Sequence, residues 1–437
     1  MSTAAVRTLP WPSWILLPLL FGYLTMTRSF AHLGVAPFYI GEAALGFLLV
    51  FHPSVVLGPW LGNQLRRGPY TQLARLTFLF IVFGFLQCVR GLESDYPKIA
   101  LQNFAFNFYI AFLFAGMWLA NRRPELLPRV IWFLAWANGL YGVAYLGVLG
   151  RFDSVDQIHA GDVGIFGQPA GSAIALLGLL AYERNLRRAI LPLLLNAFVL
   201  LGMQMRAEWL GFAIAVTVLS YLTGQVSRLV QAGIVVGGLL AVGLLVDFKI
   251  PSPSSRGGTI STRDIVGRAI SAVDKRAAAS LTRNAGDFAS TVDWRTKWWE
   301  NIVRATYANP KSTLIGGGYG YPIWLHNAED QRVNRTPHNI FMFNLAYTGW
   351  LGVMVFYALQ LCLAWNLWRA YRATGQPFGF CLWILVFVWA HFDNYLEAPY
   401  GAIPFYLLAG MALTSAIPAW PEPNGSAETL AADAGSN

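Results

Sequence analysis

The segment Arg335-Thr336-Pro337-His338-Asn339 holds the residue types that proton transfer beside an anion requires. An apolar run follows it, so Thr336 is predicted to be the N-cap of a helix and Pro337 its first residue. His338 would then lie in the first turn, where the positive end of the helix lowers the pKa of an imidazole and attracts phosphate. A neutral His338 could accept a proton there. The alternative is a histidine that only caps or packs.

Three arginines accompany His338 as candidate phosphate ligands. The guanidinium group is suited to bidentate hydrogen bonds with phosphate oxygens. Arg335 lies three residues before His338, Arg295 begins the sequence Arg-Thr-Lys-Trp-Trp, and Arg206 stands alone between two apolar runs. An isolated arginine at the end of an apolar run can also reach water with no ligand at all. The functional interpretation is favoured because all three are predicted on the same side of the membrane as His338.

Glycines and acids supply weaker candidates. Gly316-Gly317-Gly318-Tyr319-Gly320 could form an anion-binding nest of backbone amides, although a plain turn explains it as well and no Lys-Ser/Thr follows as in a phosphate-binding P-loop. Glu42 lies inside an apolar run, and Asp393 and Glu397, with Asn394, cluster after a late one. Acids at such positions are either functional or hydrogen-bonded structural groups.

Neither the histidines nor the cysteines show a metal-binding spacing. No HExxH, CxxC or CxxH pattern occurs, so we expect no metal and no disulfide framework. The residues concerned are His32, His159, His326 and His391, with Cys88, Cys362 and Cys381.

The amino-acid composition indicates that the helices that position these residues lie in a membrane. Of 437 residues, 56% are hydrophobic and 12% charged, whereas soluble domains carry about a quarter charged residues. This excludes a water-soluble globule and predicts an all-α, polytopic membrane protein. We expect about twelve spans of roughly 17–25 residues each. They are centred on 11–27, 36–52, 73–90, 100–120, 128–149, 168–182, 189–205, 208–222, 229–247, 337–366, 378–395 and 401–418.

The distribution of Lys and Arg orients these spans. With the N-terminus inside, the inward segments hold thirteen basic residues and the short outward loops hold five, as cytoplasmic loops of membrane proteins require. Both termini are therefore expected in the cytoplasm. The predicted divisions are nine spans in 1–247, a large external loop in 248–336, three spans in 337–420 and a disordered cytoplasmic tail in 421–437.

The external loop is basic, with thirteen Lys and Arg against seven acids. In a membrane protein this excess indicates an anionic partner outside the membrane, or anionic lipid headgroups, and not nucleic acid. Residues 263–283 are compatible with a basic helix. Trp294, Trp298 and Ile302 then recur at helical spacing, with Asp293 as a plausible N-cap. This pattern predicts an amphipathic helix on the membrane surface with its tryptophan side down.

These features together resemble the O-antigen ligase and polymerase superfamily of bacterial membrane glycosyltransferases. The motifs cover roughly 206–352, and the hydrophobic architecture agrees over the whole chain. The matching pattern is Arg295-x-x-x-Trp299, Pro310, Gly316-x-Gly318-x-Gly320, Pro337-His338-Asn339-x-Phe341 and Leu345-Ala-Tyr-Thr-Gly349-Trp-Leu-Gly352.

The resemblance implies roles for individual residues. His338 matches the histidine proposed to activate the acceptor hydroxyl. Arg206 matches an arginine at the outer end of a middle helix, although its flanking residues, Met and Ala, depart from the family pattern. Arg295 or Arg283 matches the second arginine thought to hold the diphosphate. Arg335 is a further candidate ligand, and the predicted supporting residues are Asn339, Gly318 and Gly320.

The resemblance also implies the reaction. The family transfers a glycan from undecaprenyl diphosphate, on the periplasmic side of the inner membrane, to lipid A-core in ligases or to a lipid-linked repeat in polymerases. The activated donor requires no ATP or other cofactor, and fixed guanidinium groups can stabilise the leaving diphosphate. We expect metal-independent transfer with inversion, by a ligase or, alternatively, a polymerase. A secondary transporter of an anionic solute is a third alternative, but the internal repeats typical of transporters are not evident.

Overall fold

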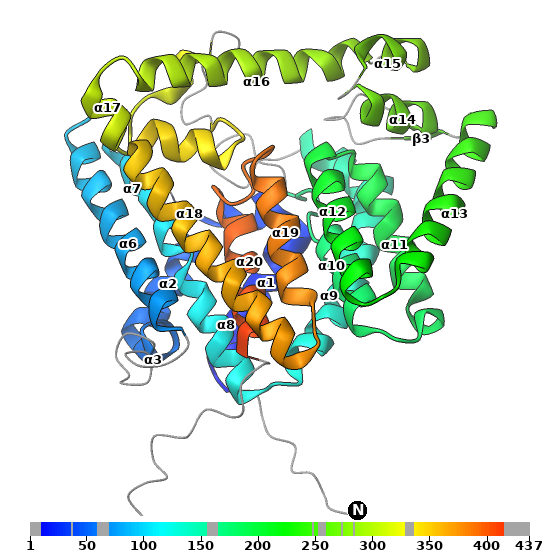
Figure 1. Ribbon diagram of the computed structural model, residues 1–437, viewed down its shortest axis with the longest axis horizontal. Helices are drawn as coiled ribbons and strands as arrows, with labels where there is room; N and C mark the ends of the chain where they lie inside the picture. The colour runs from blue at the N-terminus through cyan, green and yellow to red at the C-terminus, as the bar shows by residue number, and fades with distance from the viewer. Residues whose placement is uncertain are drawn as a thin grey trace, which may run out of the picture.

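Apolar helices form a bundle that is covered at one end by a layer of shorter or more polar helices (Figure 1). The computed structural model describes residues 10–35, 38–58, 70–154, 165–246, 249–251, 259–271, 274–282, 285–327 and 336–414. In these ranges the chain is almost entirely helical, which confirms the all-α class. The tail predicted for 421–437 lies outside them.

The bundle helices are α1 (Ser13–Ala31), α2 (Ile40–Phe51), α3 (Pro53–Val56), α6 (Thr71–Leu92), α7 (Pro97–Phe108), α8 (Ala111–Arg122), α9 (Leu126–Gly147), α10 (Ser172–Tyr182), α11 (Leu186–Met203), α12 (Arg206–Leu222), α13 (Val226–Leu245), α18 (Ile340–Thr374), α19 (Phe378–Ala390) and α20 (Pro399–Thr414). The covering layer holds α14 (Thr262–Ile270), α15 (Lys275–Leu281), α16 (Ala285–Thr306) and α17 (Pro310–Ile315). Two 3₁₀ turns, Leu149–Ser154 and Ile323–His326, complete the helical elements of the described residues. Two short antiparallel hairpins pair β1 (Gly34–Val35) with β2 (Phe38–Tyr39) and β3 (Lys249–Pro251) with β4 (Thr259–Ser261).

Five helical segments of the described residues are long and apolar enough to cross a membrane. They are Ser13–Ala31, Thr71–Leu92, Pro97–Arg122, Leu126–Gly147 and Ile340–Thr374. Each of the twelve predicted apolar stretches overlaps a helix, but several are shorter than expected. The stretch predicted at 168–182, for example, is helical only from Ser172 to Tyr182. The chain is thus a polytopic membrane protein, and the number of crossings stays a prediction.

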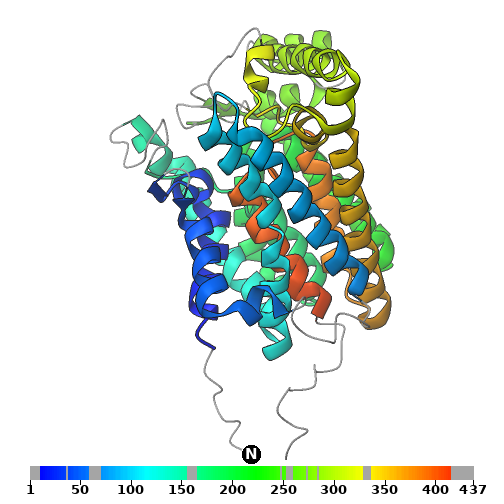
Figure 2. The same cartoon turned by 90° about the vertical axis from the view of Figure 1, so that its left-hand side faces the viewer.

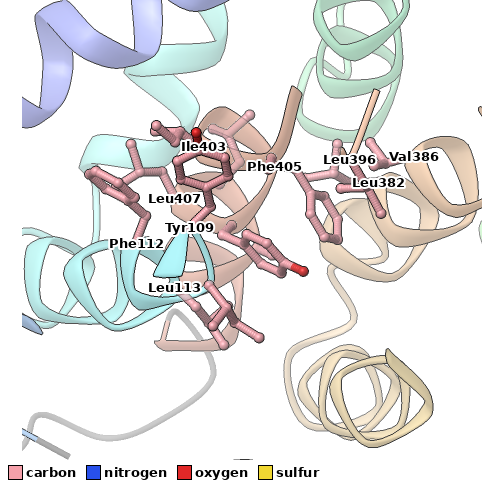
Figure 3. Packing of buried hydrophobic residues seen from close by; sticks show 14 of the residues in the cluster. Tyr109, Phe112, Leu113, Leu382, Val386, Leu396, Ile403, Phe405 and Leu407 are labelled. Carbon is pink, nitrogen blue, oxygen red and sulfur yellow. The ribbon is translucent and has the colours of Figure 1, made fainter. Parts of the chain in front are cut away.

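Small residues bring the central helices of the bundle into close contact. A side chain at Gly116 of α8 would collide with the Leu407 carbonyl of α20, and one at Gly410 would collide with the Leu113 carbonyl. Figure 3 shows side chains from both helices in this region, among them Phe112, Leu113 and Leu407. Close backbone approach at small residues is the packing mode that membrane helices favour. It fixes α20, and the turn before it, within the bundle.

Glu42 has a structural role in this bundle. It occupies the third position of α2, where its carboxylate accepts a hydrogen bond from the Tyr39 amide at 3.1 Å. Its other oxygen accepts the hydroxyl proton of Tyr109. These contacts cap α2 and join it to the α7–α8 junction, which favours the structural alternative for this acid.

The covering layer lies at the end of the bundle opposite to the end of α20 (Figures 1 and 2). Its longest helix, α16, differs from the prediction for 293–308. The helix already begins at Ala285, so Asp293 lies inside it and the predicted N-cap at Asp293 is wrong.

The tryptophan side of α16 faces protein instead of lipid. Trp298 and Ile302 are each only 1% exposed, and the Trp298 indole donates to the Ile323 carbonyl at 2.9 Å. The amphipathic helix is confirmed, but its predicted orientation on the membrane surface is wrong. Its apolar face is buried against the rest of the molecule because the bundle offers packing partners that the sequence pattern cannot distinguish from lipid.

The glycine-rich segment packs against α18. Gly316 and Gly349, which interrupts α18 with a φ of 62°, lie so close that a side chain on either would meet the backbone of the other segment. The amides of Gly317 and Gly318 donate to carbonyls of α18, each at 2.9 Å. Since these amides point at protein carbonyls, the plain turn explains the segment and the anion nest does not.

Candidate functional site

His338 lies directly before α18 and not in its first turn. Asn339 is the N-cap, because its side-chain oxygen accepts hydrogen bonds from the amides of Phe341 and Met342. The backbone of His338 has a φ of 53°, in the left-handed region that a helical residue cannot adopt. The predicted cap at Thr336 and helix start at Pro337 are therefore wrong. The His338 ring is held by a direct side-chain partner and not by the positive end of a helix.

That partner is Asp393, in the turn between α19 and α20. The Nδ1 atom of His338 lies 3.0 Å from Oδ1 of Asp393, and His338 is 7% exposed. A carboxylate at Nδ1 selects the tautomer that carries its proton on Nδ1. The opposite ring nitrogen, Nε2, is then the atom that can accept a proton from a substrate.

The surroundings of Asp393 keep it ionised. The Asn394 amide donates to Oδ1 at 2.9 Å, and the Trp389 indole lies 3.5 Å from Oδ2. Burial acts to raise the pKa of Asp393. The hydrogen bond with His338 and the charges of His338 and Arg295 outweigh burial and hold this pKa well below its ordinary value. Asp393 can therefore orient His338 and stabilise a positive charge on it.

Arg295 approaches this pair from α16. Its Nη1 atom donates to the Phe392 carbonyl at 2.9 Å, and its guanidinium carbon lies 5.6 Å from the centre of the Trp294 ring. The same ring meets His338 edge-on, with 6.4 Å between the ring centres. Burial lowers the pKa of Arg295, while the carboxyls of Asp393 and Glu397 act in the opposite direction. Arg295 thus brings a partly buried positive charge close to the histidine.

Arg206 is the first residue of α12 and reaches the same region. Its Nη1 atom donates to the Ser271 hydroxyl at 3.1 Å, at the end of α14. Its guanidinium is close enough to Arg295 for the two positive charges to repel each other. Two like charges held together in a partly buried site favour an anion between or beside them. The structure therefore places Arg206 near Arg295, and Arg295 near the His338–Asp393 pair.

A further acid, Glu397, lies next to the loop that carries His338. The Thr336 side chain and the Asn339 backbone lie near its buried carboxyl, whose two oxygens have no hydrogen-bond partner among the described residues. Burial is the largest of the influences that raise the pKa of Glu397, which reaches about 8, and the nearby Asp393 carboxylate adds to it. The sequence marked Asp393 and Glu397 only as members of one cluster. It did not indicate that Asp393 contacts His338, because the two residues are 55 positions apart.

The other predicted site residues are distributed differently. Arg283 and Arg335 lie outside the described residues. Gly318 and Gly320, with φ of 87° and 80°, pack against α6 and the turn that follows it. Asn339 supports the site as the N-cap of α18. Among the described residues, no group of three or more His, Cys, Asp and Glu side chains could hold a metal ion.

Fold and site together define a polytopic membrane protein with a His–Asp pair and two arginines where the helical layer meets one end of its bundle. Residues 191–357 match a family of proteins described as O-antigen ligase, which confirms the resemblance found in the sequence. This segment contains Arg206, Arg295 and His338, whereas Asp393 lies beyond it. No curated protein matches the chain. The segment that contains Arg206, Arg295 and His338 is thus similar to O-antigen ligases.

Proposed function

We propose that the protein transfers a glycan from undecaprenyl diphosphate to a sugar hydroxyl of lipid A-core at the periplasmic face of the inner membrane. The observation that carries this proposal is the His338–Asp393 pair with Arg295 and Arg206 beside it. A general base and two guanidinium groups are what glycosyl transfer from a lipid diphosphate requires. The family match supports the reaction class, and the arrangement of these side chains supports the assignment of roles.

In the proposed mechanism, Nε2 of His338 removes the proton from the acceptor hydroxyl. The hydroxyl oxygen forms a bond to the anomeric carbon of the donor sugar, and the bond from that carbon to the diphosphate oxygen breaks. The diphosphate leaves with the bonding electron pair, and Arg206 and Arg295 stabilise its negative charge. The ionised carboxylate beside this base, Asp393, is hydrogen-bonded to His338 and so is assigned to orient it. A single base without a separate nucleophile favours one displacement, with inversion at the anomeric carbon.

The predicted division of the chain into membrane and external segments indicates on which side of the membrane the reaction occurs. We infer that 248–336 forms the external segment, with 1–247 and 337–420 embedded in or facing the membrane and both termini in the cytoplasm. Placement of α14–α17 together at one end of the bundle supports this arrangement (Figure 1). Donor and acceptor would then meet between this layer and the bundle, where all four proposed residues lie.

An in vitro transfer assay tests the function. Purified protein would be mixed with an undecaprenyl-diphosphate glycan and either lipid A-core or a second lipid-linked repeat, with EDTA present. We expect product on lipid A-core, and a loss of rate of about 10²–10⁴-fold in His338→Ala. The matched control is His326→Ala, a histidine of the 3₁₀ turn Ile323–His326 that pairs with Tyr321 at 2.7 Å, and this variant should retain most activity.

Each outcome of this assay has a definite meaning. A ladder of lipid-linked glycan would establish the polymerase instead of the ligase. Loss of transfer with EDTA, restored by a divalent metal, would refute the metal-independent mechanism. No transfer to either acceptor, with His338→Ala equal to the parent in cells, would favour the anion transporter.

A further inference from the structure

Helix α14 contacts the segment that carries Arg206 at two points. At the first point, Nη1 of Arg206 donates to the hydroxyl of Ser271, a buried residue at the C-terminal end of α14. At the second point, Nη1 of Arg268 donates to the Gln204 carbonyl at 3.1 Å. Gln204 lies two residues before Arg206, in the turn between α11 and α12. Helix α14 thus holds both the guanidinium of Arg206 and the backbone that leads to it.

The Ser271 hydroxyl is oriented to accept a hydrogen bond from Arg206. A serine hydroxyl has one proton to donate, and that of Ser271 goes to the Arg268 carbonyl at 2.9 Å. The lone pairs of the oxygen are then left for the guanidinium of Arg206, at 3.1 Å. Threonine would keep this acceptor at position 271, whereas alanine would remove it.

The turn before Arg206 has a strained backbone. Gln204 has a φ of 54° and a ψ of 33°, a left-handed conformation that is unfavourable for a residue with a side chain. Its side chain is buried, and Nε2 has no hydrogen-bond partner among the described residues, so this amide group does not offset the strain. Strained residues persist where surrounding contacts hold them, and they cluster at binding sites. Arg268 supplies such a contact through the Gln204 carbonyl.

Arg206 needs to be held because its charge is close to that of Arg295. The two guanidinium groups repel each other in the absence of an anion. An arginine side chain also has several rotatable bonds, and a ligand that must order it loses affinity. A side chain already held beside Arg295 offers a diphosphate two prearranged cations.

We propose that Ser271 and Arg268 are positioning residues for Arg206, which keep its guanidinium beside Arg295 before the donor diphosphate binds. The inference rests on the proposed function, because it assumes that Arg206 binds this diphosphate. Loss of either contact should weaken donor binding. The rate at saturating donor should change little, because a bound diphosphate itself holds Arg206 and the His338–Asp393 pair is untouched.

Binding measurements on the purified full-length protein test the role of Ser271. The probe is farnesyl diphosphate, a short lipid diphosphate, with its affinity measured by calorimetry. Ser271→Ala should bind about five- to tenfold more weakly, the usual effect of losing one hydrogen bond. Ser271→Thr, which keeps the hydroxyl, should bind like the parent. The matched control is Ser280→Ala, which removes an exposed hydroxyl of the neighbouring helix α15 and should also bind like the parent.

A double-mutant cycle separates positioning from a general loss of packing. The quantity measured is kcat/KM for the undecaprenyl-diphosphate glycan in Ser271→Ala, Arg206→Ala and the double variant. If Ser271 acts through Arg206, the double variant should equal Arg206→Ala. A hydroxyl that only stabilises the fold would lower kcat/KM again in the double variant. That result, or a fall in kcat without a rise in KM in Ser271→Ala, would overturn the role of Ser271.

A variant of the second contact keeps the inference testable if Ser271→Ala does not fold. Arg268→Met removes the hydrogen bond to the Gln204 carbonyl and keeps a long side chain, and it should also weaken binding of farnesyl diphosphate. Parental affinity in a folded Ser271→Ala or Arg268→Met would overturn the role of that residue alone. Absence of binding by the parent, or parental kcat/KM in Arg206→Ala, would overturn the proposed function of Arg206, and this inference with it.

Discussion

Among single residues, Asp393 gives the sharpest test of the pair. Asp393→Asn keeps the shape of the side chain but replaces an acceptor-only carboxylate by an amide, which can favour the wrong tautomer of His338. We expect transfer to slow by about 10²–10⁴-fold, as in other enzymes whose histidine loses its carboxylate, with donor affinity changed far less. Single-turnover kinetics with saturating donor would measure the rate separately from binding.

The matched control for this variant is Asp293→Asn, which makes the same chemical change at an exposed position of α16. Its rate should equal that of the parent. A normal rate in Asp393→Asn would show that the His338–Asp393 contact has no part in the reaction. An equal loss in both variants would point to a general effect of charge in the covering layer.

The raised pKa of Glu397 predicts how the stability of the protein depends on pH. Its pKa is about 8 in the folded protein against an ordinary value of 4.5, so the folded state holds more protons between these pH values. Stability therefore falls as the pH rises from 4.5 through 8, because the buried group must ionise. Glu397→Gln should unfold at a higher temperature than the parent at pH 9 and differ less at pH 5. Thermal unfolding in detergent measures this, and a larger difference at pH 5 would contradict it.

Among the helices, α18 depends on a glycine at its interruption. Gly349 and Gly375 both have positive φ, of 62° and 72°, which costs alanine about 1–2 kcal/mol. A Cβ at Gly349 would also lie 2.5 Å from the Gly316 amide nitrogen, whereas one at Gly375 meets nothing within 4 Å. Gly349→Ala should therefore lower stability by about 1–3 kcal/mol more than Gly375→Ala. Equal unfolding temperatures of the two variants would show that the close packing with Gly316 contributes nothing.

Helix α16 is coupled to the histidine through an indole. Trp299 donates from Nε1 to the Pro337 carbonyl at 2.8 Å, directly before His338. Trp299→Phe removes this hydrogen bond, worth about 1 kcal/mol, and should slow transfer about fivefold without unfolding the protein. Trp365→Phe, on the exposed side of α18, is the control and should not change the transfer rate. Steady-state transfer rates of both variants, with circular dichroism as a check on folding, test this prediction. Equal rates in the two variants would contradict it.

Hydrophobic runs predicted the presence of the helices well. The exact ends of the helices and the contacts between them were harder to predict from the sequence. An apolar segment of the required length can be recognised from the sequence alone, and each predicted stretch overlaps a helix. The start of α18 was misplaced because Thr336 and Asn339 are both good caps, and only the left-handed backbone of His338 decides between them. The tryptophan face of α16 was misassigned because an apolar face packs equally well on lipid and on protein.

Across the whole molecule, the site is assembled from distant parts of the chain. The site residues Arg206, Arg295, His338 and Asp393 come from α12, α16, the segment before α18 and the turn after α19. The arginines and the histidine could be predicted from residue type, from their expected side of the membrane and from the family pattern. The pairing of His338 with Asp393 could not, because it depends on how α18 and α19 pack. Nothing in the sequence marks which acid faces which histidine.

The orientation of the whole molecule decides whether this site can meet a periplasmic donor. Helix α18 begins beside His338, bends at Gly349 and ends at Thr374, and its part after the bend spans about 40 Å of the bundle towards Gly375. In spheroplasts, Glu300→Cys should react with a membrane-impermeant maleimide, and Gly375→Cys should react only after the membrane is opened. The parent is the control, since its Cys88 and Cys381 are buried and Cys362 is partly buried. The reverse pattern would place His338 in the cytoplasm, where the proposed transfer could not occur. The positive-inside orientation inferred from the arginine-rich loops would then be wrong as well.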